Sequence, residues 1–86
     1  MAEKKIGEVF KFFSKQGVAA VKIIQGELRV GDTIRIIGHT TNLTEVVISM
    51  EVNNCKVERA AVGDSAGIKI SDRAREGDSV FKVTPD

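Results

Sequence analysis

The clearest structural pattern in this chain is carried by ten residues, Leu43-Thr44-Glu45-Val46-Val47-Ile48-Ser49-Met50-Glu51-Val52. From Glu45 onward, apolar side chains tend to alternate with polar ones, which places the two kinds on opposite faces. The apolar face comprises Val46, Ile48, Met50 and Val52. A period of two is typical of a half-buried β-strand. The stretch therefore predicts one long strand whose apolar face lies in the core.

The rest of the chain has strand character at short spacing, and helical periodicity is poor throughout. The further predicted strands are residues 6–13, 18–25, 33–37, 56–58, 66–70 and 79–83. The predicted core comprises Val21, Ile34, Val46, Ile48, Met50, Ile68, Ile70, Phe81 and Val83. Several short strands without a long helix predict an all-β antiparallel fold, and closure into a barrel would remove the exposed sheet edges.

Length and composition predict one small globular domain over residues 1–86, with a core at about 6–83 and short loose tails. Hydrophobic residues make up 42% of the 86 residues and charged residues 29%. No apolar run reaches the ~18 residues of a membrane span, and residues 1–7 lack the apolar stretch of a signal peptide. A single cysteine, Cys55, cannot form an internal disulfide. We therefore expect a cytoplasmic protein without membrane association.

The charge balance limits the classes of partner. Thirteen Lys and Arg residues against twelve Asp and Glu residues leave a net charge of +1, which argues against a strongly basic nucleic-acid coat. Trp and Tyr are absent and Phe occurs four times, too few for a broad base-stacking platform. We expect no DNA binding, and any RNA contact would use a local basic patch.

One short signature occurs three times, each time before a predicted strand. Its copies are Gly31-Asp32-Thr33-Ile34, Gly63-Asp64-Ser65-Ala66 and Gly77-Asp78-Ser79-Val80. Glycine can adopt positive φ, and aspartate can hydrogen-bond the backbone two residues further on, so the pair favours a tight turn. Metal binding is the alternative, but no copy has the ligand density of a calcium loop. The signature predicts turns, and the absence of a Cys/His cluster predicts no metal or cofactor.

These turns belong to longer segments that resemble a known family. Residues 26–36 resemble the "G-x-L-x-x-G-D-x-I-x-I" segment in the second domain of translational GTPases such as elongation factor Tu. Residues 47–50 resemble its next strand, residues 57–68 its "V-x-x-A-x-x-G-D-x-x-G-I" segment, and residues 75–80 its closing "G-D-x-V". The resemblance implies a small closed antiparallel β-barrel of six strands.

Two departures from that family narrow the expected function. The chain has no G-x-x-x-x-G-K-[ST] phosphate loop, so we expect no GTP binding by this chain alone. Ser49 stands where elongation factor Tu carries an acidic residue near its aminoacyl-end pocket, so the resemblance does not extend to aminoacyl-tRNA binding. Gly38-His39-Thr40-Thr41 resembles a segment of small stand-alone translation-elongation-factor-like proteins. The resemblance to the second domain of translational GTPases implies a non-enzymatic module that binds RNA or a ribonucleoprotein.

The candidate nucleic-acid site combines cations with polar donors. Its residues are Lys69, Arg73, Arg75, His39, Thr40 and Thr41. Phosphate binding needs cations for energy and hydroxyl or amide donors for register. The alternative is ordinary solvated surface, because acidic residues are interleaved with the basic ones and loops are polar by default.

No catalytic residue is expected. Cys55 and His39 are separated by a long predicted strand, and no third group is placed to orient a nucleophile and its base. Two hypotheses remain, an RNA-binding module and a protein-interaction module that docks on a separately encoded enzyme or GTPase. The near-neutral charge and the lack of an aromatic platform favour the second.

Overall fold

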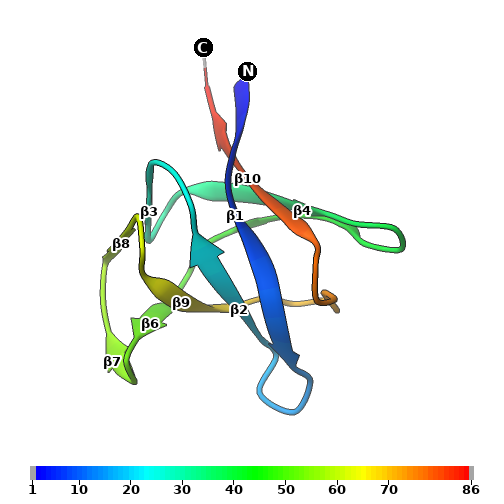
Figure 1. Ribbon diagram of the computed structural model, residues 1–86, viewed down its shortest axis with the longest axis horizontal. Helices are drawn as coiled ribbons and strands as arrows, with labels where there is room; N and C mark the ends of the chain where they lie inside the picture. Colours follow the sequence, from blue (N-terminus) through cyan, green and yellow to red (C-terminus); the bar gives the residue numbers. More distant parts are fainter. Residues whose placement is uncertain (1, 86) are drawn as a thin grey trace.

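The computed structural model describes residues 2–85, which fold into strands joined by turns (Figure 1). About 60% of these residues lie in strands and none lies in a helix, which confirms the predicted all-β class. The strands are β1 Ala2–Phe13, β2 Val18–Ile23, β3 Glu27–Arg29, β4 Thr33–Ile37, β5 Asn42–Val46, β6 Met50–Val52, β7 Cys55–Lys56, β8 Arg59–Ala61, β9 Ser65–Lys69 and β10 Ser79–Thr84.

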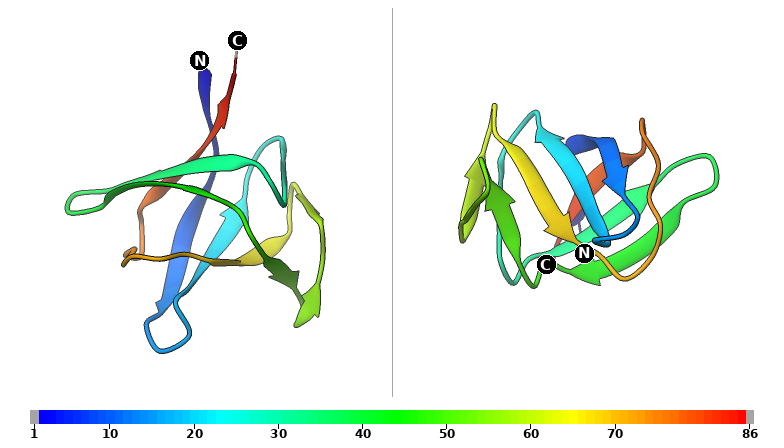
Figure 2. Two further views of the ribbon diagram at one scale, coloured as in Figure 1. Left: turned by 180° about the vertical axis from the view of Figure 1, so that it is seen from behind. Right: turned by 90° about the horizontal axis from the view of Figure 1, so that it is seen from below.

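Eight of the strands form one antiparallel sheet in the order β5-β4-β10-β1-β2-β9-β6-β7, and β3 pairs separately with β8. The sheet curls around a common interior (Figure 2). The prediction of a closed six-stranded barrel is wrong, because within residues 2–85 no sheet closes and the larger one has eight strands. In the described part of the chain, the edge strands β5 and β7 do not pair with each other, and β3 and β8 pair as strands only with each other.

The predicted long strand over residues 43–52 is interrupted at residues 47–49. The Val47 amide donates to the Asp32 carbonyl at 2.8 Å, and the Val47 carbonyl accepts from the Gly31 amide at 2.8 Å. These bonds hold Val47 in the core, so its neighbours Val46 and Ile48 are 51% and 69% exposed. Their predicted burial is wrong, because the side that the alternation marked as apolar points outward at Val46, just before the break, and at Ile48, within it.

The last strand shows the same reversal. Val80 is fully buried, whereas Phe81 and Val83, predicted for the core, are only half-buried on the opposite side of β10. Lys82 shares the inner side with Val80, because side chains alternate along a strand. Its ammonium group lies 3.2 Å from the Asp32 carboxylate.

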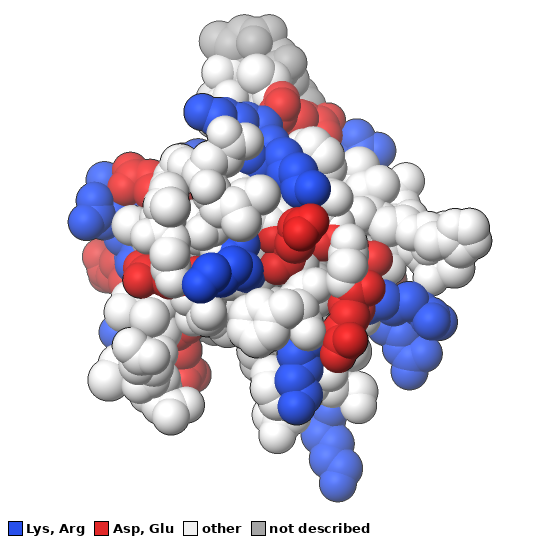
Figure 3. Space-filling model, in the orientation of Figure 1, with Lys and Arg blue, Asp and Glu red and all other residues white. Residues whose placement is uncertain are grey.

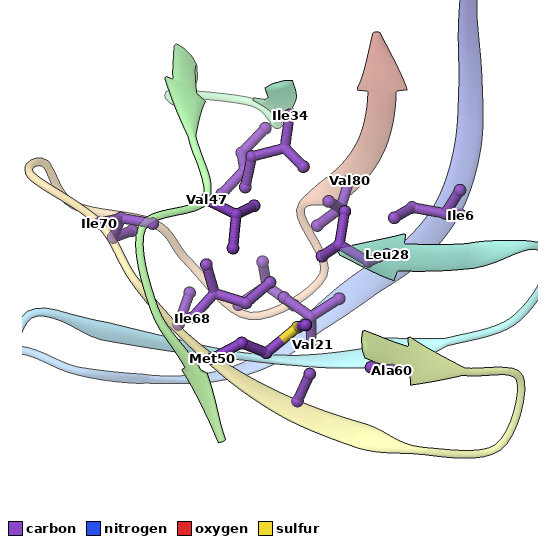
Figure 4. Packing of buried hydrophobic residues seen from close by; sticks show 14 of the residues in the cluster. Ile6, Val21, Leu28, Ile34, Val47, Met50, Ala60, Ile68, Ile70 and Val80 are labelled. Carbon is purple, nitrogen blue, oxygen red and sulfur yellow. The ribbon is translucent and has the colours of Figure 1, made fainter. Parts of the chain in front are cut away.

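The remaining predicted core residues are buried, which confirms Val21, Ile34, Met50, Ile68 and Ile70. They pack with side chains from almost every strand in one cluster (Figure 4). The ribbon contributes Leu28 and Ala60, which the sequence analysis did not identify.

The chain ends also differ from expectation. Residues 2–5 were predicted as part of a loose tail, but they lie in β1, where Ala2 pairs with Thr84 and Lys5 with Phe81. Met1 and Asp86, the outermost residues of the predicted tails, lie outside the described residues. Backbone pairing thus extends outward to Ala2 and Thr84.

The three Gly-Asp signatures form turns, as predicted. Gly31, Gly63 and Gly77 have φ values of 100°, 95° and 91°. In each turn the aspartate amide donates to the carbonyl three residues earlier, at 3.0, 3.0 and 3.1 Å. The aspartate carboxylate accepts from the amide of that same residue, at 2.8, 2.9 and 2.8 Å. The carboxylate therefore acts three residues back rather than two ahead, and each turn is closed twice by one aspartate.

Candidate functional site

Arg73 and Arg75 lie in the loop between β9 and β10, beside the end of β1. Together with Phe12, Ser14 and Glu76 they line an open hollow of about 540 Å³. Both arginines are exposed, and within residues 2–85 neither forms a salt bridge. Their guanidinium groups are therefore available to an anion.

The predicted polar donors lie on the turn between β4 and β5. His39 and Thr40 are exposed, but Thr41 is only 5% exposed and its carbonyl accepts from the Gly38 amide at 2.8 Å. The Thr41 hydroxyl is thus poorly placed for a contact at the surface.

The β4–β5 turn and the β9–β10 loop lie at the same end of the molecule (Figures 1 and 2). A Cβ atom placed on Gly38 would overlap the Asp78 carboxylate, and Ile37 pairs directly with Ser79. Asp78 in turn accepts from the Arg75 amide. The predicted groups around His39 and Arg75 therefore share one end of the fold, which is here called the basic end.

Lys69 lies apart from this arrangement, on the other side of the β1–β2 turn. Its ammonium group donates to the Gln16 carbonyl at 2.7 Å. It borders a groove of about 570 Å³, which is also lined by Phe13, Ser49 and Asn54. Figure 3 shows basic side chains projecting at the bottom and lower right of the molecule, over the β1–β2 turn and the β9–β10 loop.

A second surface, which the sequence analysis missed, lies over the β3–β8 ribbon. Arg29 stands directly opposite Arg59. Glu27 bridges them, with one carboxylate oxygen 3.2 Å from Arg29 Nε and the other 3.1 Å from Arg59 Nη1. The hydrogen bond from Arg29 and the two positive charges lower the pKa of Glu27, although desolvation opposes them.

Exposed apolar side chains border this ribbon at both ends. Val30 and Ile48, which are 40% and 69% exposed, line one hollow with Val57. At the other end, Ile24 and Val62 are 49% and 60% exposed, and the segments that carry them are joined by a hydrogen bond from the Gly63 amide to the Ile23 carbonyl. These are four of the seven large hydrophobic residues that are exposed in the described chain.

The turn signature contained a signal for two of these residues. Val30 and Val62 immediately precede Gly31 and Gly63, at the second position of their four-residue turns. A central position of a turn projects away from the sheet, so an apolar residue there is exposed. We call the outer side of β3 and β8, together with Ile24, Val30, Ile48 and Val62, the ribbon face.

Other kinds of site have little support. Residues 2–85 contain no cluster of His, Cys, Asp and Glu that could hold a metal ion. The same residues include no helix of the length and hydrophobicity needed to cross a membrane. Cys55 is exposed in β7 as a free thiol.

Residues 16–80 match the protein family described as elongation factor Tu domain 2. The chain belongs to this family. The match confirms the resemblance to the second domain of translational GTPases that the sequence segments indicated.

Curated relatives of this elongation factor Tu domain 2 protein are much longer than the chain. An uncharacterized protease of Methanocaldococcus jannaschii is 44% identical over 78 residues, and a collagenase of Porphyromonas gingivalis is 33% identical over 78 residues. Both matches cover 90% of this chain, but only 19% and 22% of the relatives. The chain therefore spans about a fifth of their length.

Solved structures share the fold. The C-terminal domain of a protein assigned to the U32 peptidases of Geobacillus thermoleovorans superposes with a TM-score of 0.86 at 18% identity, covering 94% of this chain and 93% of that domain. Its selenomethionine variant gives a TM-score of 0.83 at 18% identity, covering 90% and 96%. This elongation factor Tu domain 2 fold thus also occurs as a terminal domain of a peptidase-related protein.

Proposed function

We propose that this chain is a non-catalytic module that docks on another protein through the ribbon face. The observation that carries the proposal is a pair of exposed apolar side chains at each end of one two-stranded ribbon, Val30 with Ile48 and Ile24 with Val62. Isolated exposed apolar residues are common on soluble proteins, but a cluster of them marks a surface that gains free energy when a partner covers it.

The relatives suggest what kind of partner this is. In the protease and the collagenase, the matching segment accounts for about a fifth of the chain, so most of each protein lies outside it. A module of this kind that accompanies a catalytic part needs a face to bind it. We propose the catalytic part of an enzyme of the peptidase kind as the partner of the ribbon face.

RNA or a ribonucleoprotein is a second candidate partner, favoured by the basic end. Arg73 and Arg75 lie there without salt bridges among the described residues, at the same end of the fold as the exposed residues His39 and Thr40 (Figures 1 and 2). Acidic Asp72 and Glu76 flank the arginines, so the excess positive charge is small. The ribbon face therefore has the stronger support.

Affinity capture from an extract of the source cells tests the two candidates together. The bait is the full chain, as wild type, as Val30→Asp with Ile48→Asp, and as Arg73→Glu with Arg75→Glu, each captured with and without ribonuclease. We expect a specific protein that survives ribonuclease and is lost only with the Val30 and Ile48 variant. Capture that ribonuclease abolishes, or that depends on the arginine variant instead, would overturn the docking proposal in favour of RNA.

A further inference from the structure

Two like charges face each other at the end of the β3–β8 ribbon that Val30 follows. Arg29 and Arg59 are direct cross-strand partners, an arrangement that destabilises a sheet unless something offsets it. Glu27 offsets only part of the repulsion between the two guanidinium groups, because its single carboxylate gives one oxygen to each arginine. Two positive charges therefore share one negative charge.

The two guanidinium groups also retain unused donors. Each carries five N–H donors, and within residues 2–85 each donates once to a side chain, through Arg29 Nε and Arg59 Nη1. Their side chains are 59% and 58% exposed. Leu28 and Ala60 are buried beneath them, at 0% and 1% exposure, so the ribbon backbone that carries the arginines is held firmly.

Apolar surface adjoins this pair directly. Arg29, Val30, Glu58 and Arg59 line an open hollow of about 420 Å³. Val30 and Glu58 also line the neighbouring hollow that contains Ile48. The charged groups around the two hollows are Arg29, Arg59, Lys56, Glu27 and Glu58, which leaves an excess of one positive charge.

We infer that the partner of the ribbon face presents a carboxylate side chain flanked by aliphatic side chains. The carboxylate binds between Arg29 and Arg59, and the aliphatic groups cover Val30 and Ile48. A partner carboxylate would accept from the guanidinium donors that Glu27 leaves unused, and the planar guanidinium fork matches it in shape. A phosphate would meet the same donors, but the neighbouring Val and Ile side chains provide no aromatic surface for bases. This inference rests on the docking function proposed above.

Short capped peptides provide a defined test on the isotope-labelled full chain. The probe peptide has the core Leu-Glu-Val-Leu in a Ser/Gly frame, with both termini blocked so that glutamate is its only carboxylate. Matched probes replace the glutamate by glutamine or by lysine, and a uridine decamer tests phosphate. Amide and guanidinium chemical shifts report where each probe binds.

We expect the glutamate peptide to shift the Arg29 and Arg59 side-chain signals and to bind about tenfold more tightly than the glutamine peptide. Arg29→Gln with Arg59→Gln should remove that difference, whereas Arg73→Gln with Arg75→Gln should leave it unchanged. A cooperative denaturation transition of each variant verifies folding.

Equal binding of the glutamate and glutamine peptides, no shifts at millimolar peptide, or tighter binding of the uridine decamer would overturn the inference. If any of these results occurs together with ribonuclease-resistant capture that depends on Ile48, the docking function is supported and only the recognition of a partner carboxylate is rejected. Loss of both the glutamate-dependent peptide binding and the Ile48-dependent capture would overturn the docking function as well.

Discussion

The Glu45 carboxylate accepts hydrogen bonds from both the amide and the hydroxyl of Ser71, 26 residues away, at 2.8 to 3.0 Å. Glu45 lies in the edge strand β5, and Ser71 follows β9, so this contact joins two parts of the curled sheet that no backbone ladder connects. The Glu45 side chain thus connects the edge strand β5 to the segment that follows β9.

Removal of this contact should lower the free energy of unfolding. Glu45→Ala leaves the Ser71 amide without its acceptor, at a cost of about 1–2 kcal/mol because water can partly replace the carboxylate. Chemical denaturation measures the loss. Glu51→Ala, an exposed glutamate without a salt bridge among the described residues, should change stability by less than about 0.5 kcal/mol. Equal effects of the two substitutions would show that the Ser71 contact contributes nothing.

Gly38 should resist substitution because the Asp78 carboxylate occupies the space of its missing side chain. Asp78 is 4% exposed and is held by the Arg75 amide, so it cannot swing away freely. Gly38→Ala should cost about 1–3 kcal/mol, the range for overpacking. The same substitution in an Asp78→Ala background should cost clearly less, because the overlapping carboxylate is gone. Additive losses in thermal or chemical denaturation would contradict this account.

Two isoleucines test which side chains form the core. Ile68 is fully buried in β9, and Ile68→Ala should cost about 2–5 kcal/mol, a large part of the stability of so small a domain. Ile48 is 69% exposed, so Ile48→Ala should change the denaturation midpoint little, by less than about 0.5 kcal/mol. A large loss from Ile48→Ala would place that side chain in the core, as the alternation of the sequence suggested.

The strand faces that sequence alternation predicted wrongly have a common physical cause. Glu45 and Lys82 lie on the inner sides of β5 and β10, where each finds a partner distant in sequence, Ser71 for the glutamate and Asp32 for the lysine. A prediction from local pattern assigns a charged residue to the solvent-facing side of its strand. Because side chains alternate with a period of two, one such error exchanges the predicted inner and outer faces of the whole strand. Only the folded chain reveals such partners.

The ribbon face was missed for a different reason. Strands β3 and β8 have three residues each, too few to show any period, whereas the Gly-Asp turns that follow them were predicted from their own chemistry. The candidate basic end could be predicted in part, because Arg73 and Arg75 are close in sequence. The closeness of this arginine loop to the turn that carries His39 depends on the packing of Gly38 against Asp78, and no local sequence pattern encodes that packing.

The ion cluster of the ribbon face should respond to acid. The pKa of Glu27 is lowered chiefly by the hydrogen bond from Arg29, so the carboxylate should titrate below the ordinary range of glutamate. A lowered pKa means that the cluster stabilises the fold at neutral pH and loses this contribution as the pH falls through that pKa. Carboxyl NMR titration measures it, and Arg29→Gln should raise the pKa whereas the distant Arg73→Gln should not. No response to Arg29→Gln would show that the hydrogen bond is not maintained in solution.

RNA binding at the basic end should differ from non-specific electrostatic attraction in its dependence on salt. If RNA binds there, Arg73 and Arg75 each neutralise about one phosphate, so Arg73→Glu with Arg75→Glu should weaken binding and reduce the slope of log affinity against log salt by about two units. Fluorescence anisotropy with a labelled single-stranded RNA across a salt series gives both quantities. Charge reversal at Lys4 and Lys22, which leaves the basic end intact, is the control and should leave most of the slope in place. If the two variants behave alike, the arginines act only through net charge, and a specific RNA site at this end is excluded.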